Sequence, residues 1–205
     1  MKIAIIGTGN VGGALATHWA ARGHEINLGV RDTENFKGKE LLKQANIRAL
    51  AVKEAVQVSD VILIAAPAMH AMEVVQSLGD TTGKVIIDAM NIVMGRGPAG
   101  YTNTASAILD HTQTRDVVKC FNTTGFNNMV NPVYGTTALD LFVAGDSVKG
   151  RETAIQLALD AGFENCYNVG GNDKFELMEQ FAWFWINLAM FQGAGRDIGF
   201  KLLKR

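Results

Sequence analysis

Residues 1–26, MKIAIIGTGNVGGALATHWAARGHEI, carry the clearest indication of fold class in the chain. Its apolar run Ile3 to Ile6 predicts a buried strand, and residues 10–21 predict an amphipathic helix. A second strand, Glu25 to Gly29, follows directly. This order of strand, glycine-rich turn, helix and strand is typical of the first unit of a parallel α/β sheet.

Three glycines, Gly7, Gly9 and Gly12, occupy the turn between the first strand and the helix. A tight turn needs the first glycine, close approach of the backbone to a pyrophosphate needs the second, and packing of helix against strand needs the third. The helix N-terminus directs unpaired N–H groups and a positive dipole end at the phosphates. The G-x-G-x-x-G spacing alone is a weak signal, but directly after a strand it predicts a dinucleotide site.

Composition restricts the partners of the chain. Its 205 residues are enough for one well-packed core that needs neither disulfide nor metal. With 19 Lys and Arg against 20 Asp and Glu, the net charge of −1 provides no basic field for nucleic acid or an anionic membrane. We therefore expect a small-molecule partner.

Neither a metal site nor a targeting segment is predicted. Cys120 and Cys166 lie too far apart in sequence for a C-x-x-C motif and fall in apolar runs, which favours two small buried residues. The apolar run Phe181 to Phe191 is about half the roughly 20 residues that a membrane span requires. The N-terminus lacks the pattern of a signal peptide, so we expect a cytoplasmic protein.

Strands and helices alternate through most of the chain. We expect further strands at 47–50, 61–65, 84–88, 117–121, 141–145 and 166–169, and helices at 36–45, 52–58, 69–78, 103–111 and from a Ser147 cap to Ala161. Several strands are apolar throughout, which indicates parallel strands covered on both faces. The prediction is a Rossmann-like α/β fold, doubly wound and mostly parallel, with a nucleotide-binding domain at 1–171 and a short helical C-terminal segment at 172–205.

Ligands of such sheets collect at the carboxyl ends of the strands. The strand ends here carry small residues and amides, and Asn91, Asn122 and Thr123 are candidates to orient a nicotinamide or an acceptor ring. Turn capping by short polar side chains is the alternative for each. His70 follows the fourth strand and either donates a hydrogen bond into the cleft or lies on a solvated helix face.

The end of the second strand, INLGVRD, bears on the identity of the nucleotide. NAD sites commonly place an acidic residue there, whereas an arginine accommodates the 2′-phosphate of NADP. Gly29 and Val30 occupy the usual acidic place and Arg31 follows, which favours NADP, with Thr8 as a further donor. Asp32 leaves the NAD reading open, because a carboxylate there can hold a ribose hydroxyl.

No nucleophilic triad or carboxylate pair is evident, so no catalytic side chain is predicted. Hydride transfer between two bound ring systems depends on proximity and orientation more than on a protein acid or nucleophile.

The apolar C-terminal run is spread around a helical wheel, which predicts burial on most sides. Its role stays open between three alternatives: core packing, a dimer interface and a wall of the substrate site.

On these residues the chain resembles the deazaflavin-coenzyme-dependent NADP reductase family. The resemblance rests on GTGNVGG at the start, IAAPAMHA after the fourth strand, KCFNTTGFNNM at the sixth, FVAGD at the seventh and the terminal NLAMFQGAGRDIGFKLL. It implies NADP as cofactor, coenzyme F420 or a flavin as co-substrate, a C-terminal part that helps to form the acceptor pocket, and a homodimer. The cofactor-binding residues predicted from the sequence and the resemblance together are Gly7, Thr8, Gly9, Asn10, Val11, Gly12, Arg31, Ala66, Pro67, His70, Asn91, Asn122 and Thr123.

Three positions differ from the family pattern as we align it: Val30 stands for a serine, Asp32 for an arginine and Asn122 for a histidine. Other functions therefore stay open beside hydride transfer to a deazaflavin. These are an NADPH-dependent reductase of a flavin, a ferric chelate or a small carbonyl compound, as in the similar cytosolic domains of membrane metalloreductases, and a non-catalytic NADP sensor.

Overall fold

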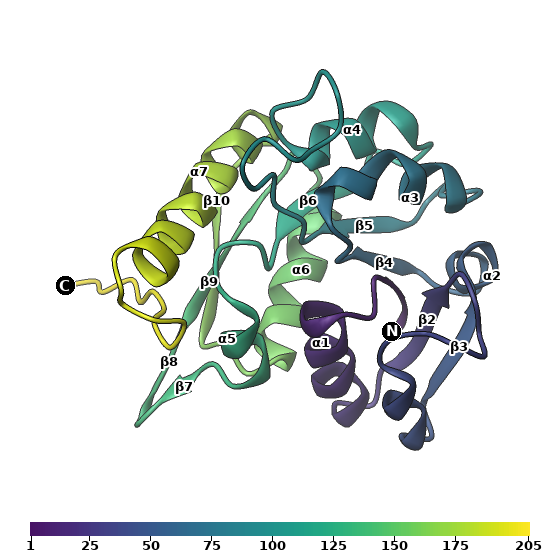
Figure 1. Ribbon diagram of the computed structural model, residues 1–205, viewed down its shortest axis with the longest axis horizontal. Helices are drawn as coiled ribbons and strands as arrows, with labels where there is room; N and C mark the ends of the chain where they lie inside the picture. Colours follow the sequence, from purple (N-terminus) through teal and green to yellow (C-terminus); the bar gives the residue numbers. More distant parts are fainter.

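The computed structural model describes residues 1–205, in which eight strands form a sheet with helices on both faces (Figure 1). The strand order is β10-β9-β6-β5-β4-β1-β2-β3. Neighbours are parallel except β6 and β9, which are antiparallel. The strands are β1 Lys2–Ile6, β2 Glu25–Val30, β3 Ile47–Ala51, β4 Val61–Ile64, β5 Val85–Asp88, β6 Val117–Cys120, β9 Asp140–Ala144 and β10 Asn165–Gly170. The predicted Rossmann-like, doubly wound and mostly parallel sheet is confirmed.

Seven helices and a small hairpin complete the chain. The helices are α1 Asn10–Ala21, α2 Val52–Gln57, α3 Ala71–Ser77, α4 Thr104–His111, α5 Phe126–Val130, α6 Val148–Asp160 and α7 Phe175–Ile186. Short helical segments are η1 Lys39–Lys43, η2 Ala68–His70, η3 Asn172–Lys174 and η4 Asn187–Phe191, and the hairpin is β7 Val133–Tyr134 with β8 Thr137–Ala138. None of the helices has the length and apolar character needed to cross a membrane.

Alternate residues of the central strands feed a separate core on each face of the sheet. On one face, Ile5 belongs to a cluster of 29 buried residues that α1 and α6 cover. On the other, Ile6 belongs to a cluster of 14 buried residues under α2, α3 and α4. The indole of Trp19 on α1 donates a 2.8 Å hydrogen bond to the carbonyl of Leu157 on α6, which fixes the two helices to each other.

Helix α7 lies against the β9 side of the sheet and is only partly buried (Figure 1). Its Phe175 and Met178 pack with Ala144 of β9 in a small third cluster. On the opposite face Trp183 is 43% exposed and Phe184 51% exposed. The prediction that this apolar run is buried on most sides is therefore wrong, because only one stripe of the helix contacts the sheet.

Several boundaries differ from the sequence prediction for local reasons. The expected helix at 36–45 is the short segment η1, which begins after Gly38 with a φ of +92°. The expected sixth strand stops at Cys120, because Phe121 has a φ of +66° that no strand residue adopts. Helix α5 and the hairpin were not predicted. The Ser147 cap is confirmed by a 2.8 Å hydrogen bond from the Gly150 amide to its hydroxyl.

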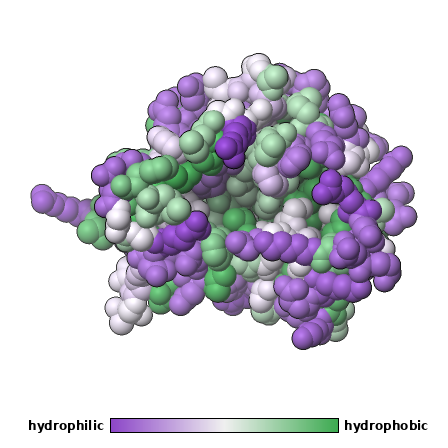
Figure 2. Space-filling view, viewed as in Figure 1, coloured by the Kyte–Doolittle hydropathy of each residue, from purple (hydrophilic) through white to green (hydrophobic).

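The strand order reverses between β1 and β4, which are neighbours in the sheet. In an open α/β sheet this switch point opens a crevice outside the carboxyl ends of the strands. Figure 2 shows this face of the molecule hollowed between the side that carries α7 and the side that carries the first strands. Apart from Arg31, which follows β2, the candidate residues follow the ends of β1, β4, β5 and β6 in the chain.

Candidate cofactor-binding site

The turn after β1 is packed so tightly that two of its three glycines admit no side chain. Gly7 has a φ of +102°, and a Cβ there would lie 2.6 Å from the carbonyl of Ala65. A Cβ on Gly12 would lie 2.0 Å from the carbonyl oxygen of Gly7. The first glycine thus makes the turn and the third lets α1 approach β1, as the spacing predicts.

Gly9 is different, because the turn leaves space above it. A Cβ built on Gly9 meets no atom within 4 Å, and its φ of −74° is ordinary for any residue. No side chain caps α1, and the first backbone hydrogen bond of the helix runs from the Gly13 amide to the Gly9 carbonyl at 2.8 Å. The amides of residues 10–12 therefore lack partners within the helix. A diphosphate fits this open, amide-rich turn by size and charge.

Arg31 and Asp32 follow β2 and have separate environments. The Arg31 side chain is 88% exposed, and its nearest charge is Glu73 on α3, with Nη1 and Oε1 3.6 Å apart. The Asp32 carboxylate accepts hydrogen bonds from the amides of Glu34 and Asn35 at 2.8 and 3.2 Å. The Asp32 carboxylate thus stabilises the turn that follows it, while the exposed Arg31 guanidinium can contact an anionic ligand.

Lys37, which the sequence analysis did not select, lies over the N-terminus of α1. Its Nζ donates a 3.2 Å hydrogen bond to Oδ1 of Asn10, and its carbonyl accepts a hydrogen bond from the hydroxyl of Thr8. This places an ammonium beside the unpartnered amides of the turn. No signal in the sequence marks Lys37, because the loop that carries it has neither a motif nor a regular period.

A cavity of about 480 Å³ borders the turn and includes Thr8, Gly9, Asn10 and Lys37 in its lining. It extends along α1 toward α5, away from the ends of β4 and β5, and none of the other predicted residues lines it. The structure therefore brings three predicted residues, Thr8, Gly9 and Asn10, together in a cavity, and the other candidates lie outside it.

At the end of β4 the candidates are small or exposed. Ala66 is half-buried and Pro67 exposed. The His70 side chain is half exposed, and its Nδ1 lies 3.3 Å from Oε2 of Glu73. Its contact in the structure is thus a neighbouring carboxylate on the solvated side of α3.

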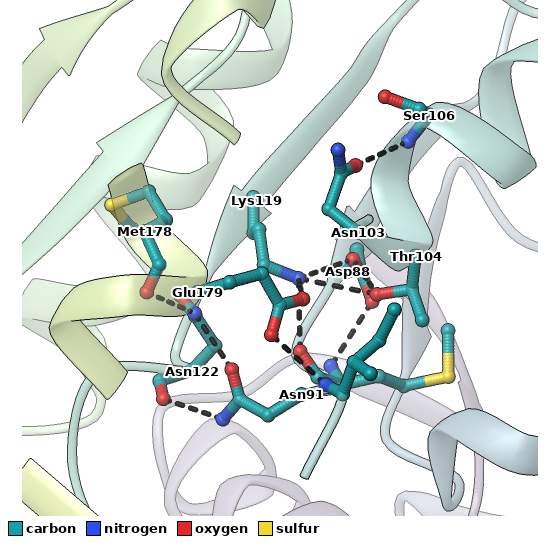
Figure 3. Close-up of polar contacts among 11 residues, drawn as sticks. Asp88, Asn91, Asn103, Thr104, Ser106, Lys119, Asn122, Met178 and Glu179 are labelled. Carbon is teal, nitrogen blue, oxygen red and sulfur yellow. Dashed lines mark hydrogen bonds and ion pairs between the residues drawn. The ribbon is translucent and has the colours of Figure 1, made fainter. Parts of the chain in front are cut away.

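Asn91 and Asn122, which follow β5 and β6, form a reciprocal pair (Figure 3). The Asn91 amide donates to the backbone carbonyl of Asn122 at 2.7 Å, and the Asn122 amide donates to Oδ1 of Asn91 at 2.9 Å and to the carbonyl of Met178 at 3.1 Å. Oδ1 of Asn122 is buried without a partner. Thr123 beside it is only 1% exposed. The left-handed conformation of Phe121 turns the chain so that Asn122 reaches both α7 and Asn91.

Next to this pair lies a buried ionic cluster that was not predicted from the sequence (Figure 3). Nζ of Lys119 is 2.8 Å from Oδ2 of Asp88 and 2.8 Å from Oε1 of Glu179 on α7. It also donates to the carbonyl of Met90 at 2.9 Å and lies 3.2 Å from the hydroxyl of Thr104. Burial alone lowers the pKa of Lys119, but the two carboxylates outweigh it and hold that pKa above its usual value.

A sequence signal for this cluster exists. Lys119 interrupts the apolar strand VVKC, and Asp88 closes the neighbouring apolar strand VIID. A charged residue inside a strand buried on both faces requires a partner. Glu179 gives no such signal, since it lies on an amphipathic helix that carries a second glutamate, Glu176.

A second cavity of about 300 Å³ lies where α7 and η4 approach the loop after β5. Five of its six lining residues are apolar, and Arg196 supplies its charge. The apolar members include Val93, which follows Asn91 closely in sequence, and Trp185, whose indole donates to the carbonyl of Ile198 at 2.8 Å. The cavity thus adds an apolar wall with one guanidinium beside the ends of the strands.

Comparison with known proteins agrees with this geometry. Residues 2–92 match the family model described as NADP oxidoreductase coenzyme F420-dependent. An F420-dependent NADP reductase of Methanothermobacter marburgensis is 27% identical over 208 residues, which cover 92% of this chain and 92% of that protein.

Solved structures share the fold. A crystal structure from Arthrobacter sp. FB24, provisionally named an F420-dependent NADP reductase, superposes with a TM-score of 0.83 at 23% identity over the whole of both chains. A reductive aminase of Aspergillus terreus, solved with NADPH and ethyl levulinate, gives a TM-score of 0.66 at 18% identity over 94% of this chain and 62% of that one. The chain is thus similar over most of its length to F420-dependent NADP reductases, and its first 92 residues carry the match to the family model.

Proposed function

We propose that the chain is an NADP(H)-dependent oxidoreductase that transfers hydride between the nicotinamide and a flat redox acceptor of the deazaflavin type, coenzyme F420 or a close analogue. The observation that carries the proposal is the uncapped N-terminus of α1 above an open Gly9, with the exposed Arg31 at the end of β2. The Methanothermobacter relatives that match over almost their whole length support the choice of acceptor.

The residues of the turn bind the nucleotide in this proposal. The amides of Asn10, Val11 and Gly12 donate to the pyrophosphate, and Gly9 admits it because no Cβ fills the space. Arg31 binds the 2′-phosphate with its planar fork of donors. Lys37 adds a positive charge at the N-terminus of α1.

The nicotinamide belongs at the ends of β4, β5 and β6, where Ala66, Pro67, Asn91 and Asn122 form the floor. When bound, the nicotinamide supplies or accepts the hydride. The unpaired Oδ1 of Asn122 is a buried acceptor that an amide N–H of the carboxamide would satisfy. The apolar wall of the second cavity, with Trp185, suits a flat ring stacked against the nicotinamide.

The experiment is an acceptor panel with the purified chain. Loss of NADPH absorbance is followed with coenzyme F420, a flavin, a ferric chelate and a small ketone, each with a protein-free control. The proposal expects turnover with coenzyme F420 above all other acceptors. Turnover with another acceptor alone would replace coenzyme F420 as the proposed substrate. Tight NADPH binding without turnover on any acceptor would favour a non-catalytic NADP sensor.

We also propose that the chain forms a homodimer in the cytoplasm. The exposed apolar side chains of α7 and η4, among them Trp183, Phe184 and Phe191, support a protein interface there. Sedimentation at several concentrations tests the assembly. A monomer at all of them would contradict it.

A further inference from the structure

We propose that the cluster of Lys119, Asp88 and Glu179 carries one net negative charge under the nicotinamide floor and thereby favours the oxidised, positively charged ring over the reduced one. The inference rests on the proposed function, since it requires the nicotinamide to lie at the strand ends. Because the oxidised nucleotide is then bound more tightly relative to the reduced one, bound NADPH is a stronger hydride donor than free NADPH.

The first step is the charge count. One ammonium faces two carboxylates, at 2.8 Å each, and the hydrogen bonds and ion pairs of the three side chains include no other ionisable group. The side chains of Lys119 and Asp88 are fully buried, and that of Glu179 is 9% exposed. Solvent therefore screens this charge far less than it screens the exposed charges of the rim.

The second step is the set of donors around the two carboxylates. Asp88 accepts from the hydroxyl of Thr104 at 2.6 Å and from the Met90 amide at 3.0 Å, in addition to Lys119. Glu179 accepts from the Ile92 amide at 2.9 Å through its second oxygen. Both oxygens of each carboxylate thus face donors. The Lys119 ammonium between them keeps its proton, because the carboxylates raise the pKa of Lys119.

The third step is location. Asp88 ends β5, and its neighbours Met90 and Ile92 are both bonded into the cluster through their backbones. Asn91 stands between these two residues and pairs with Asn122 (Figure 3). The charge thus lies directly under the segment that forms the proposed floor of the nicotinamide site.

The magnitude follows from Coulomb's law. The oxidised ring carries a unit positive charge that the reduced ring lacks. A unit charge that acts over about 10 Å through an effective dielectric of about 20 changes the ratio of the two affinities on the order of tenfold. For a two-electron couple, a tenfold change in that ratio corresponds to about 30 mV in the potential of the bound nucleotide.

The test measures the dissociation constants of NADP⁺ and NADPH for the wild type and Glu179→Gln by calorimetry. Glutamine keeps an oxygen for the Ile92 amide but removes the charge. We therefore expect the affinity for NADP⁺ to fall by about three- to thirtyfold relative to the affinity for NADPH. Glu176→Gln, an exposed position on the same helix, is the matched control and should leave the ratio unchanged.

Asp88→Asn provides a second variant that also makes the cluster neutral, and circular dichroism establishes that each variant is folded. The same shift of the ratio in both variants supports the inference. An unchanged ratio in a folded variant overturns it, and so do equal losses for both nucleotides, which would indicate a merely structural role. Failure of the wild type to bind either nucleotide would instead contradict the proposed function.

Discussion

The carbonyl oxygen of Gly7 lies 2.0 Å from the point that a Cβ on Gly12 would occupy. Because the clash is with backbone, Gly12→Ala must displace α1 from β1, and we expect a loss of about 2–4 kcal/mol in the free energy of unfolding. The neighbouring Gly13→Ala is the control, since its Cβ meets nothing closer than 3.8 Å and helix propensity favours alanine. Urea denaturation measures both. Equal stability of the two variants would refute the packing role of Gly12.

Arg31 is expected to separate NADPH from NADH. A charge-assisted hydrogen bond contributes about 1.5–3 kcal/mol, so Arg31→Ala should weaken NADPH binding about tenfold to a hundredfold and leave NADH nearly unchanged. Titration with the two nucleotides measures this, and NADH serves as the internal control. Equal losses for both would remove the assignment of Arg31 to the 2′-phosphate.

Lys37 is expected to act on both nucleotides alike, because its ammonium lies beside Asn10 at the N-terminus of α1. Lys37→Met should weaken the binding of NADPH and NADH by a similar factor, about two- to fivefold for an exposed charge. Lys39→Met removes a charge from the same region, where Lys39 bonds to the Glu34 carbonyl, and should change neither affinity. A loss limited to NADPH would place Lys37 on the 2′-phosphate instead.

Asp140 joins the C-terminal tail to the start of β9. Its carboxylate bonds to Lys201 at 2.9 Å and to the Leu202 amide at 2.9 Å. Burial raises the pKa of Asp140, but these partners and Asn165 outweigh it and bring that pKa below its usual value.

A lowered pKa in the folded state stabilises the protein above the unfolded-state pKa of about 3.9, and the contribution is lost as pH falls through the folded value. Asp140→Asn should therefore lower the melting temperature at pH 7 and have a smaller effect near pH 3. The melting temperature across this range is the measurement. An equal loss at both pH values would contradict the electrostatic role.

The first strand, turn and helix follow from local pattern, whereas the burial of α7 does not. The strand before Gly7 can be predicted because it is a continuous apolar run, and the helix after Gly9 because its apolar residues recur with the helical period. The exposure of Trp183 and Phe184 depends on which side of α7 the sheet covers, and that is set by tertiary contacts alone.

The site shows the same division. Gly9 and Arg31 could be selected from motif and spacing, whereas Lys37 could not, because a loop brings it back onto α1. Lys119 was predictable in principle, as a charge inside an apolar strand. Its second partner Glu179 was not, because 60 positions of sequence separate the two and only the packing of α7 brings them together.

Titration of NADPH into wild type and Gly9→Ala, side by side, shows whether the backbone of the first turn binds a diphosphate. The alanine fits the free protein, since its Cβ meets no atom within 4 Å, so the melting temperature should not fall. We predict tight binding to the wild type and at least about a tenfold loss in the variant, because the Cβ occupies the space where the pyrophosphate approaches. Unchanged affinity in Gly9→Ala, or no binding of NADPH to the wild type, would contradict binding of the diphosphate by this backbone.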